Sequence, residues 1–151
     1  QQGQPDAAIA HFRRCLAYRG QTLVVPVEEG VTSHVSLIGI AQALWQKGDL
    51  ARAERIAQRA CELAPDYEVG QMALSKMQLG KGDAASALQT LTSYLQRRPD
   101  SAGACQQATL ILQRIGCADQ AKRMGRRAAD LLNKKGAVDE AARMERILAA
   151  I

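Results

Sequence analysis

The sequence has few aromatic residues, few prolines and no long apolar run, and each shortage limits the possible structures. Aromatic residues make up 3% of the 151 residues, and only four prolines occur. Long helices are therefore permitted, because proline is the residue that interrupts them. No stretch of about 18 consecutive apolar residues is present, so the sequence predicts no transmembrane helix. The first residue is Gln rather than Met, and we expect the chain to be a fragment of a longer protein.

The motifs of common catalytic sites are also missing. The sequence contains no G-x-x-x-x-G-K-[ST], no G-x-G-x-x-G, no H-E-x-x-H and no G-x-S-x-G. Two pairs of adjacent carboxylates occur, Glu28-Glu29 and Asp139-Glu140. Solvation in a loop and placement at a helix start explain these pairs better than acid–base catalysis does. We predict no enzymatic activity and no cofactor for this segment, while the activity of a full-length protein stays open.

Cysteine and histidine are too few and too scattered to predict a metal site. The cysteines are Cys15, Cys61, Cys105 and Cys117, and no two of them form a C-x-x-C pair. His11 and Cys15 are four residues apart, which is two ligands short of a structural zinc site. Cysteine among alanines on a helix is usually a small buried side chain. The pattern indicates a reducing compartment and predicts a cytoplasmic protein.

The net charge of +5 comes mainly from one region. Between Arg97 and Lys135 there are nine Lys or Arg residues and three Asp residues. The basic patch consists of Arg97, Arg98, Lys122, Arg123, Arg126, Arg127, Lys134 and Lys135. A solvated helix face explains these residues best, and binding of nucleic acid or of an acidic surface is the alternative. The region has no aromatic residue for base stacking, which argues against nucleic acid.

The most informative feature that is present is an internal repeat. The stretch KGDLARAERIAQRACELAPD begins at Lys47, and the similar stretch KGDAASALQTLTSYLQRRPD begins at Lys81. Gly48 thus corresponds to Gly82, and a further step of the same length reaches Gly116. A period between about 20 and 50 residues is typical of proteins that stack one supersecondary unit many times.

The apolar spacing between the turn signals predicts about eight helices. The first helix is expected from about Pro5 to Arg19, and a loop insertion follows at residues 20–33. Three helical hairpins are expected at residues 34–67, 68–101 and 102–135, and residues 136–151 form a capping helix. We predict that these elements form a single domain. Residues 118–132 can be the second helix of the third hairpin or the first helix of a fourth unit, because Gly136 follows Gly116 after only 20 residues.

The 34-residue unit resembles the tetratricopeptide repeat, a helix–turn–helix family. The unit that starts at His34 carries the family's large, small, Gly-Asp and Pro positions at Leu37, Ile40-Ala41, Leu44, Gly48-Asp49, Ala53, Ala57, Ala60 and Pro65. The unit that starts at Glu68 matches at Gly82-Asp83, Ala87, Leu91, Tyr94 and Pro99. The third unit is degenerate, with Asn133 in place of the proline. Residues 1–19 resemble the second helix of a partial repeat.

The resemblance implies an all-α fold, a right-handed α-solenoid of antiparallel helix hairpins. It also implies a non-catalytic scaffold that binds a protein or peptide ligand, as an extended peptide or a helix, in a concave groove. The groove positions of the family correspond to Val35, Ile38, Gln42, Trp45, Gln46, Val69, Met72, Lys76, Leu79, Gln106, Leu110, Gln113 and Arg114. Trp45 is the only tryptophan, and it can either lie in the groove or pack between hairpins. Ile38 and Gln42 replace the Lys and Asn types with which a chaperone-binding subfamily clamps a peptide carboxylate, so we expect no such clamp.

Two further interpretations stay open. The layout of VEEGVTSHVSLIGIAQALWQKGDLARAE is similar to repeat tails of bacterial family 2 glycosyltransferases, which implies an appendage of an enzyme whose catalytic domain precedes Gln1. A homodimer through the helix predicted at residues 5–19 is the other, since the end of a repeat array leaves a face uncovered.

Overall fold

The computed structural model describes residues 6–10, 13 and 34–151. The described residues form helices and short turns, with no strand among them. They fall into two compact units, the first ending at Lys81 and the second comprising Gly82–Ile151. Most of the helix predicted at residues 5–19 and the whole loop predicted at residues 20–33 lie outside the described residues.

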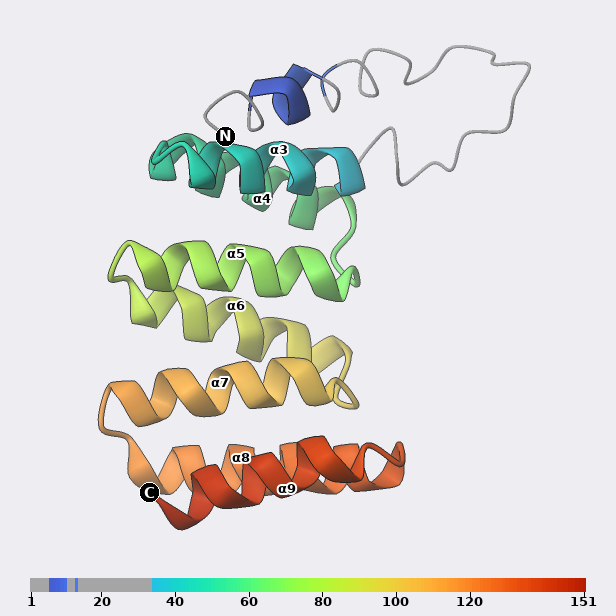
Figure 1. The fold of residues 1–151 in the computed structure, drawn as a ribbon, viewed down its shortest axis with the longest axis vertical. Helices are drawn as coiled ribbons and strands as arrows, with labels where there is room; N and C mark the ends of the chain where they lie inside the picture. The colour runs from blue at the N-terminus through green and yellow to red at the C-terminus, as the bar shows by residue number, and fades with distance from the viewer. Residues whose placement is uncertain (1–5, 11–12, 14–33) are drawn as a thin grey trace, which may run out of the picture. The chain divides into compact units, whose positions relative to one another are not determined.

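Among its described residues, the first unit contains three long helices and a short helical segment. These are α3 (His34–Gln46), α4 (Leu50–Leu63), α5 (Glu68–Gly80) and the helical residues 6–10. Helices α3, α4 and α5 run antiparallel in succession and are joined by short turns (Figure 1). The contacts of α4 with both α3 and α5 hold the unit together, and α3 also contacts α5.

Small side chains allow the helices of the first unit to approach closely. Ala41, Ala53 and Ala57 have no exposed surface. Larger apolar side chains fill the space around them, and the same core cluster includes Ile9 from the short helical segment. Burial of such apolar surface stabilises a fold by roughly 25 cal/mol per Å². The alanine positions that carry the repeat signature are therefore the contact positions of the helices.

The second unit contains four helices. They are α6 (Ala84–Arg97), α7 (Ala102–Arg114), α8 (Ala118–Lys134) and α9 (Val138–Ala149). Helix α7 contacts α6 and α8, and α8 also contacts α9. Gly125 makes the approach of α8 to its neighbours close, since a β-carbon there would stand 2.6 Å from Cδ2 of Leu148 and 3.2 Å from Cγ2 of Thr109. Helix α8 thus contacts both α7 and α9, and its assignment to the third hairpin or to a fourth unit remains a prediction.

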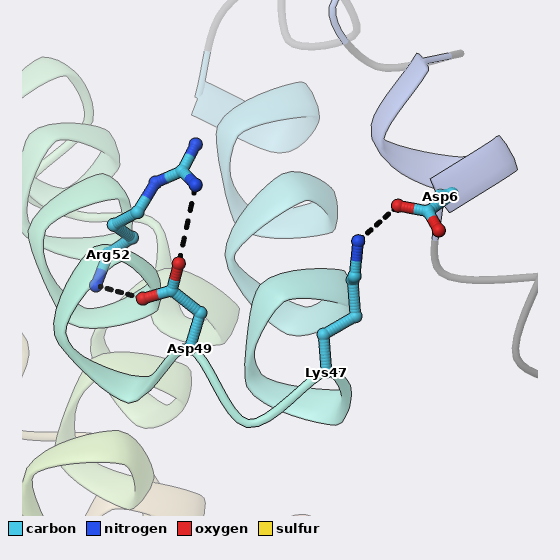
Figure 2. Close-up of polar contacts among 4 residues, drawn as sticks. All are labelled: Asp6, Lys47, Asp49 and Arg52. Atoms are coloured by element: carbon cyan, nitrogen blue, oxygen red, sulfur yellow. Dashed lines mark hydrogen bonds and ion pairs between the residues drawn. The ribbon is translucent and has the colours of Figure 1, made fainter.

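The turns explain why the helices begin where they do. Gly48, Gly82, Gly116 and Gly136 have φ values between 77° and 89°, a left-handed conformation that glycine adopts without a steric penalty. The next residue is the N-cap of the following helix. Asp49 accepts a hydrogen bond from the backbone N–H of Arg52 at 3.2 Å (Figure 2).

The other caps divide into two kinds. Asp83 accepts from the backbone N–H of Ser86 at 3.0 Å, as Asp49 does for its own helix. Cys117 and Ala137 hold the corresponding cap positions of α8 and α9 and make no side-chain hydrogen bond there. The helices that follow a Gly-Asp pair therefore start with a side-chain cap, and α8 and α9 start without one.

The helix starts follow the period of the sequence repeat. Helices α3, α5 and α7 begin at His34, Glu68 and Ala102, the first residues of the three predicted hairpins. The division into units falls inside the predicted hairpin 68–101, which gives α5 to the first unit and α6 to the second. Among the described helices, none is both long enough and apolar enough to cross a membrane.

Candidate functional site

Four of the predicted groove residues meet in one pocket of the first unit. The pocket has a volume of about 240 Å³ and is bounded by Gln42, Trp45 and Gln46 of α3 and by Ala73, Lys76 and Met77 of α5. The two helices are the first helices of successive repeats, and their contact brings side chains that are far apart in sequence onto one surface. The pocket therefore forms because α3 and α5 pack against each other.

Trp45 is partly buried and has two roles in this pocket. It lines the pocket, and its indole also lies against the backbone at the end of α5. A β-carbon added to Gly80 would stand 2.3 Å from Cη2 of Trp45 and 2.5 Å from Cζ2. The ring thus packs between α3 and α5 and borders the pocket, and a place of Trp45 in a ligand-binding groove remains a prediction.

The rim of the pocket is polar. Gln42, Gln46 and Lys76 are exposed. Within the residues that the structure describes, their side chains form no hydrogen bond or ion pair with the protein. The two amides can donate and accept hydrogen bonds, and the ammonium group can only donate. The pocket thus offers an apolar interior beside groups that are available to a ligand.

The remaining predicted groove residues of the first unit differ in accessibility. Ile38 is 3% exposed and belongs to the core, so it shapes the helix contact and offers no surface to a ligand. Val69 is 51% exposed, and Val35, Met72 and Leu79 are partly buried. None of these four lines the pocket.

The predicted groove residues of the second unit all lie on α7. Leu110 is 50% exposed, Gln113 and Arg114 are exposed, and Gln106 is partly buried. Leu110 holds the position in its repeat that Gln42 and Lys76 hold in theirs. An exposed leucine of this kind is an apolar surface feature of α7.

Two members of the basic patch contact the turn between α6 and α7, and a third, Arg98, belongs to that turn. Arg127 Nη2 donates a hydrogen bond to the carbonyl oxygen of Pro99 at 2.7 Å, and Lys135 Nζ donates to the carbonyl oxygen of Asp100 at 3.1 Å. Arg98 Nε lies 3.7 Å from Oδ1 of Asp100. These contacts give part of the patch a structural role. The other members are exposed, except for the partly buried Lys122.

A second pocket, which the sequence did not lead us to expect, lies in the second unit. It has a volume of about 370 Å³ and is formed by side chains of α6, α7 and α8, including Arg123 and Arg127 of the basic patch. Leu88 and Thr92 are four residues apart, as are Gln120 and Met124. Residues four apart lie on the same face of any helix, so this spacing in the sequence does not distinguish a pocket from an ordinary packing face.

The described cysteines are free thiols: Cys61 and Cys105 are buried and Cys117 is partly exposed. Burial raises the pKa of the Cys105 thiol above its ordinary value of 9.0, and the positive charge of Arg127 partly offsets that rise. No group of three or more His, Cys, Asp or Glu side chains that could hold a metal ion occurs among the described residues.

Residues 35–67 match the family model of the tetratricopeptide repeat. They correspond to α3, α4 and the turns around them. The predicted resemblance to tetratricopeptide-repeat proteins is thereby confirmed for the unit that starts at His34. No curated protein matches the chain at a significant level.

Solved structures with a similar fold include MamA, SycD and PcrH. MamA is 19% identical, with a TM-score of 0.69 over 89% of this chain and 72% of MamA. SycD, the type III secretion translocator chaperone of Yersinia enterocolitica, is 19% identical, with a TM-score of 0.70 over 78% of this chain and 89% of SycD. PcrH from Pseudomonas aeruginosa is 21% identical, with a TM-score of 0.70 over 86% of this chain and 97% of PcrH. The predicted all-α fold of antiparallel helix hairpins is confirmed, and the resemblance to glycosyltransferase tails finds no support in these comparisons.

Proposed function

We propose that this chain is a non-catalytic scaffold for protein–protein interaction that holds a peptide or a helix of a partner protein. The observation that carries the proposal is the pocket between α3 and α5, where Gln42, Trp45, Gln46 and Lys76 meet. Two structures of similar fold support it. SycD has been solved in complex with a peptide of the translocator YopD, and PcrH in complex with the chaperone-binding region of PopD.

The lining of the pocket indicates the chemistry of the ligand. Trp45, Ala73 and Met77 provide apolar surface, and tryptophan is enriched among the residues that dominate binding energy at protein interfaces. The amides of Gln42 and Gln46 can hydrogen-bond to the backbone of an extended segment. We expect one apolar side chain of the ligand to occupy the pocket.

The charge at the pocket favours a particular type of residue next to the apolar side chain of the ligand. Among the described residues that line the pocket, Lys76 alone is ionisable, and it is exposed at the rim. An acidic residue beside the apolar one would therefore be attracted to the pocket, although a rim charge affects association rate more than affinity. The groove residues predicted on α7, which are Gln106, Leu110, Gln113 and Arg114, remain a prediction for the second unit.

A carboxylate clamp has no support at this site. Ile38 is buried in the core, and Gln42 carries no charge. Lys76 is a single cation and lacks the planar fork with which a guanidinium binds a carboxylate through two parallel hydrogen bonds. Recognition by apolar contact and amide hydrogen bonds explains the lining better.

The proposal can be tested with peptides selected from a random library displayed on phage. Selected peptides would be synthesised and titrated against the protein, with the emission of Trp45, the only tryptophan, as a direct reporter. Trp45→Ala is expected to weaken binding by about 30-fold, the effect of losing about 2 kcal/mol at an interface hot spot, measured with labelled peptide. Gln58→Ala on α4 is the matched control, because Gln58 is exposed and does not line the pocket. Equal affinities of the wild type and Trp45→Ala would contradict the proposal.

Other roles inferred from the sequence have weaker support. Nucleic-acid binding loses part of its basis, since Arg127 and Lys135 contact the turn between α6 and α7 and Arg98 belongs to that turn. A homodimer remains a prediction, supported by a SycD structure described as an alternative dimer, and light scattering after gel filtration would test it. The cytoplasmic location and the single-domain organisation also remain predictions.

A further inference from the structure

None of the proposed groove residues lines the pocket of the second unit, which has a largely apolar floor. The floor is formed by Leu88 of α6, Ala108 and Leu112 of α7 and Met124 of α8. Thr92 also lines the pocket, but its hydroxyl already donates to the carbonyl oxygen of Leu88 at 2.8 Å. This threonine therefore has no hydrogen to donate to a ligand, and the floor favours apolar groups.

Two arginines also line this pocket. Arg123 and Arg127 lie four positions apart on α8 and therefore on one face of that helix. Among the described residues, no acidic side chain lines the pocket. Within the second unit, all of which the structure describes, neither arginine forms an ion pair with a carboxylate, and the hydrogen bond of Arg127 is to the uncharged carbonyl of Pro99.

The surrounding charge has the same sign. Between Gly82 and Ile151 there are eleven Lys or Arg residues against seven Asp or Glu residues. An anion that approaches the pocket is attracted both by the two arginines and by the field of the unit. A cation with the same apolar part would be repelled.

We propose that this pocket binds a small amphipathic carboxylate, with its apolar chain on the floor and its carboxylate at Arg123 and Arg127. A volume of about 370 Å³ lies within the range of small-ligand pockets. Guanidinium groups bind carboxylates through paired, charge-assisted hydrogen bonds, and burial of the chain supplies the apolar contribution. The proposal goes beyond the peptide-binding function, because the site uses other residues and another class of ligand.

The probes for the test are octanoate, octylammonium and acetate, titrated into the full chain and followed by calorimetry and by backbone amide shifts. Octanoate is expected to bind saturably at one site, with shifts concentrated in α6, α7 and α8. Acetate lacks the apolar chain and octylammonium has the opposite charge, so neither is expected to bind. Binding of octylammonium as tight as that of octanoate, or the absence of saturable octanoate binding, would overturn the proposal.

Two pairs of matched variants locate the site. Arg123→Gln is expected to weaken octanoate binding about tenfold, the effect of one charge-assisted hydrogen bond. Arg126→Gln removes the same charge from the same helix outside the pocket and is expected to have no effect. Thr92→Phe is expected to fill the pocket and abolish binding, while Ser93→Phe, at the next exposed position of α6, is expected to leave it intact.

Thermal unfolding of each variant would confirm that it is folded. If Arg123→Gln and Arg126→Gln weakened octanoate binding equally, the net positive charge of the unit would explain the attraction. That result would contradict a specific site at Arg123 and Arg127. The Trp45→Ala protein is expected to keep full octanoate affinity. A failure of the proposed peptide binding can therefore be told apart from a failure of the proposed carboxylate binding.

Discussion

The indole of Trp45 lies directly on the backbone of Gly80, so that the end of α3 and the end of α5 are in contact through one ring and one glycine. A β-carbon at Gly80 would stand 2.3 Å from Cη2 of the ring. At this distance two non-bonded carbon atoms repel each other, because it is much shorter than their optimal separation. Because Gly80 has no β-carbon, the indole can both border the pocket and pack between α3 and α5.

Substitution of Gly80 by alanine should displace the indole. The ring is rigid, so it must move as a whole, and we expect Gly80→Ala to lower the free energy of unfolding by about 1–3 kcal/mol, the usual cost of overpacking. Urea denaturation followed by circular dichroism gives this free energy. The emission of Trp45 should shift at the same time, because its surroundings change.

The variant Trp45→Ala removes the indole and is therefore the control for this clash. In the Trp45→Ala background, Gly80→Ala should cost nothing or stabilise the helix by up to about 1 kcal/mol, since alanine is the better helix former. If Gly80→Ala destabilised both backgrounds equally, the contact between these two residues would not be the cause.

Removal of an aspartate cap should destabilise the helix that follows it. Asp83 accepts from the N–H of Ser86 at 3.0 Å and from the Ser86 hydroxyl at 2.6 Å. We expect Asp83→Ala to lower the free energy of unfolding by about 1 kcal/mol, measured by urea denaturation. Asp83→Asn keeps an acceptor oxygen and should retain most of the stability, and a loss in Asp83→Asn as large as in Asp83→Ala would argue against capping.

Addition of a cap where the repeat lacks one should stabilise the second unit. The backbone of Cys117 has φ −84° and ψ 63°, close to φ −83° and ψ 70° at the capping residue Asp49. Cys117→Asn is expected to raise the free energy of unfolding by about 0.5–2 kcal/mol, because asparagine caps as well as aspartate. Cys117→Ala controls for loss of the thiol, and a gain equal to that of Cys117→Asn would show that the cap is not responsible.

The described cysteines should differ in reactivity. The thiolate is the reactive form, and Cys105 is buried with a raised pKa, whereas Cys117 is partly exposed. In a Cys15→Ser protein at neutral pH, we expect an aromatic disulfide reagent to label Cys117 first and Cys61 and Cys105 only on unfolding. The fast phase should vanish in Cys117→Ser, and its persistence would mean that a buried thiol is accessible.

The raised pKa of Cys105 also predicts that the free energy of unfolding depends on pH. The folded-state pKa of Cys105 lies above the ordinary value of 9.0, so the unfolded state releases this proton at lower pH than the folded state does. The contribution of Cys105 is fully present below that value and is lost as the pH rises through the folded-state pKa. Cys105→Ala should remove this dependence, as measured by urea denaturation between neutral and alkaline pH.

Much of the helical architecture could be read from the sequence because its causes are local. The turn at Gly48 needs a left-handed residue, the cap at Asp49 needs a short acceptor, and the contact at Ala53 needs a small side chain. Each requirement concerns residues that are close together in the chain. Their regular recurrence along the sequence was therefore enough to place α3 to α7.

Ile38 shows the limit of assigning a site by repeat position. Its place in the unit predicts a groove residue, but the closeness of α3 to its neighbours buries it in the core. Gln42 occupies the next turn of the same helix and reaches the pocket. The difference depends on the exact rotation of α3 against the other helices, which no pattern of one helix determines.

The sequence by itself determined the starts of α3, α5 and α7, the turn glycines, the aspartate caps and the small-residue contacts, since these follow from conformational preferences of neighbouring residues. Tertiary structure alone decided that the indole of Trp45 packs against Gly80 and that Arg123 and Arg127 line a pocket with a largely apolar floor. Both arrangements join side chains from different helices. Their distances are fixed by how closely the helices pack, and that depends on the shapes of many side chains at once.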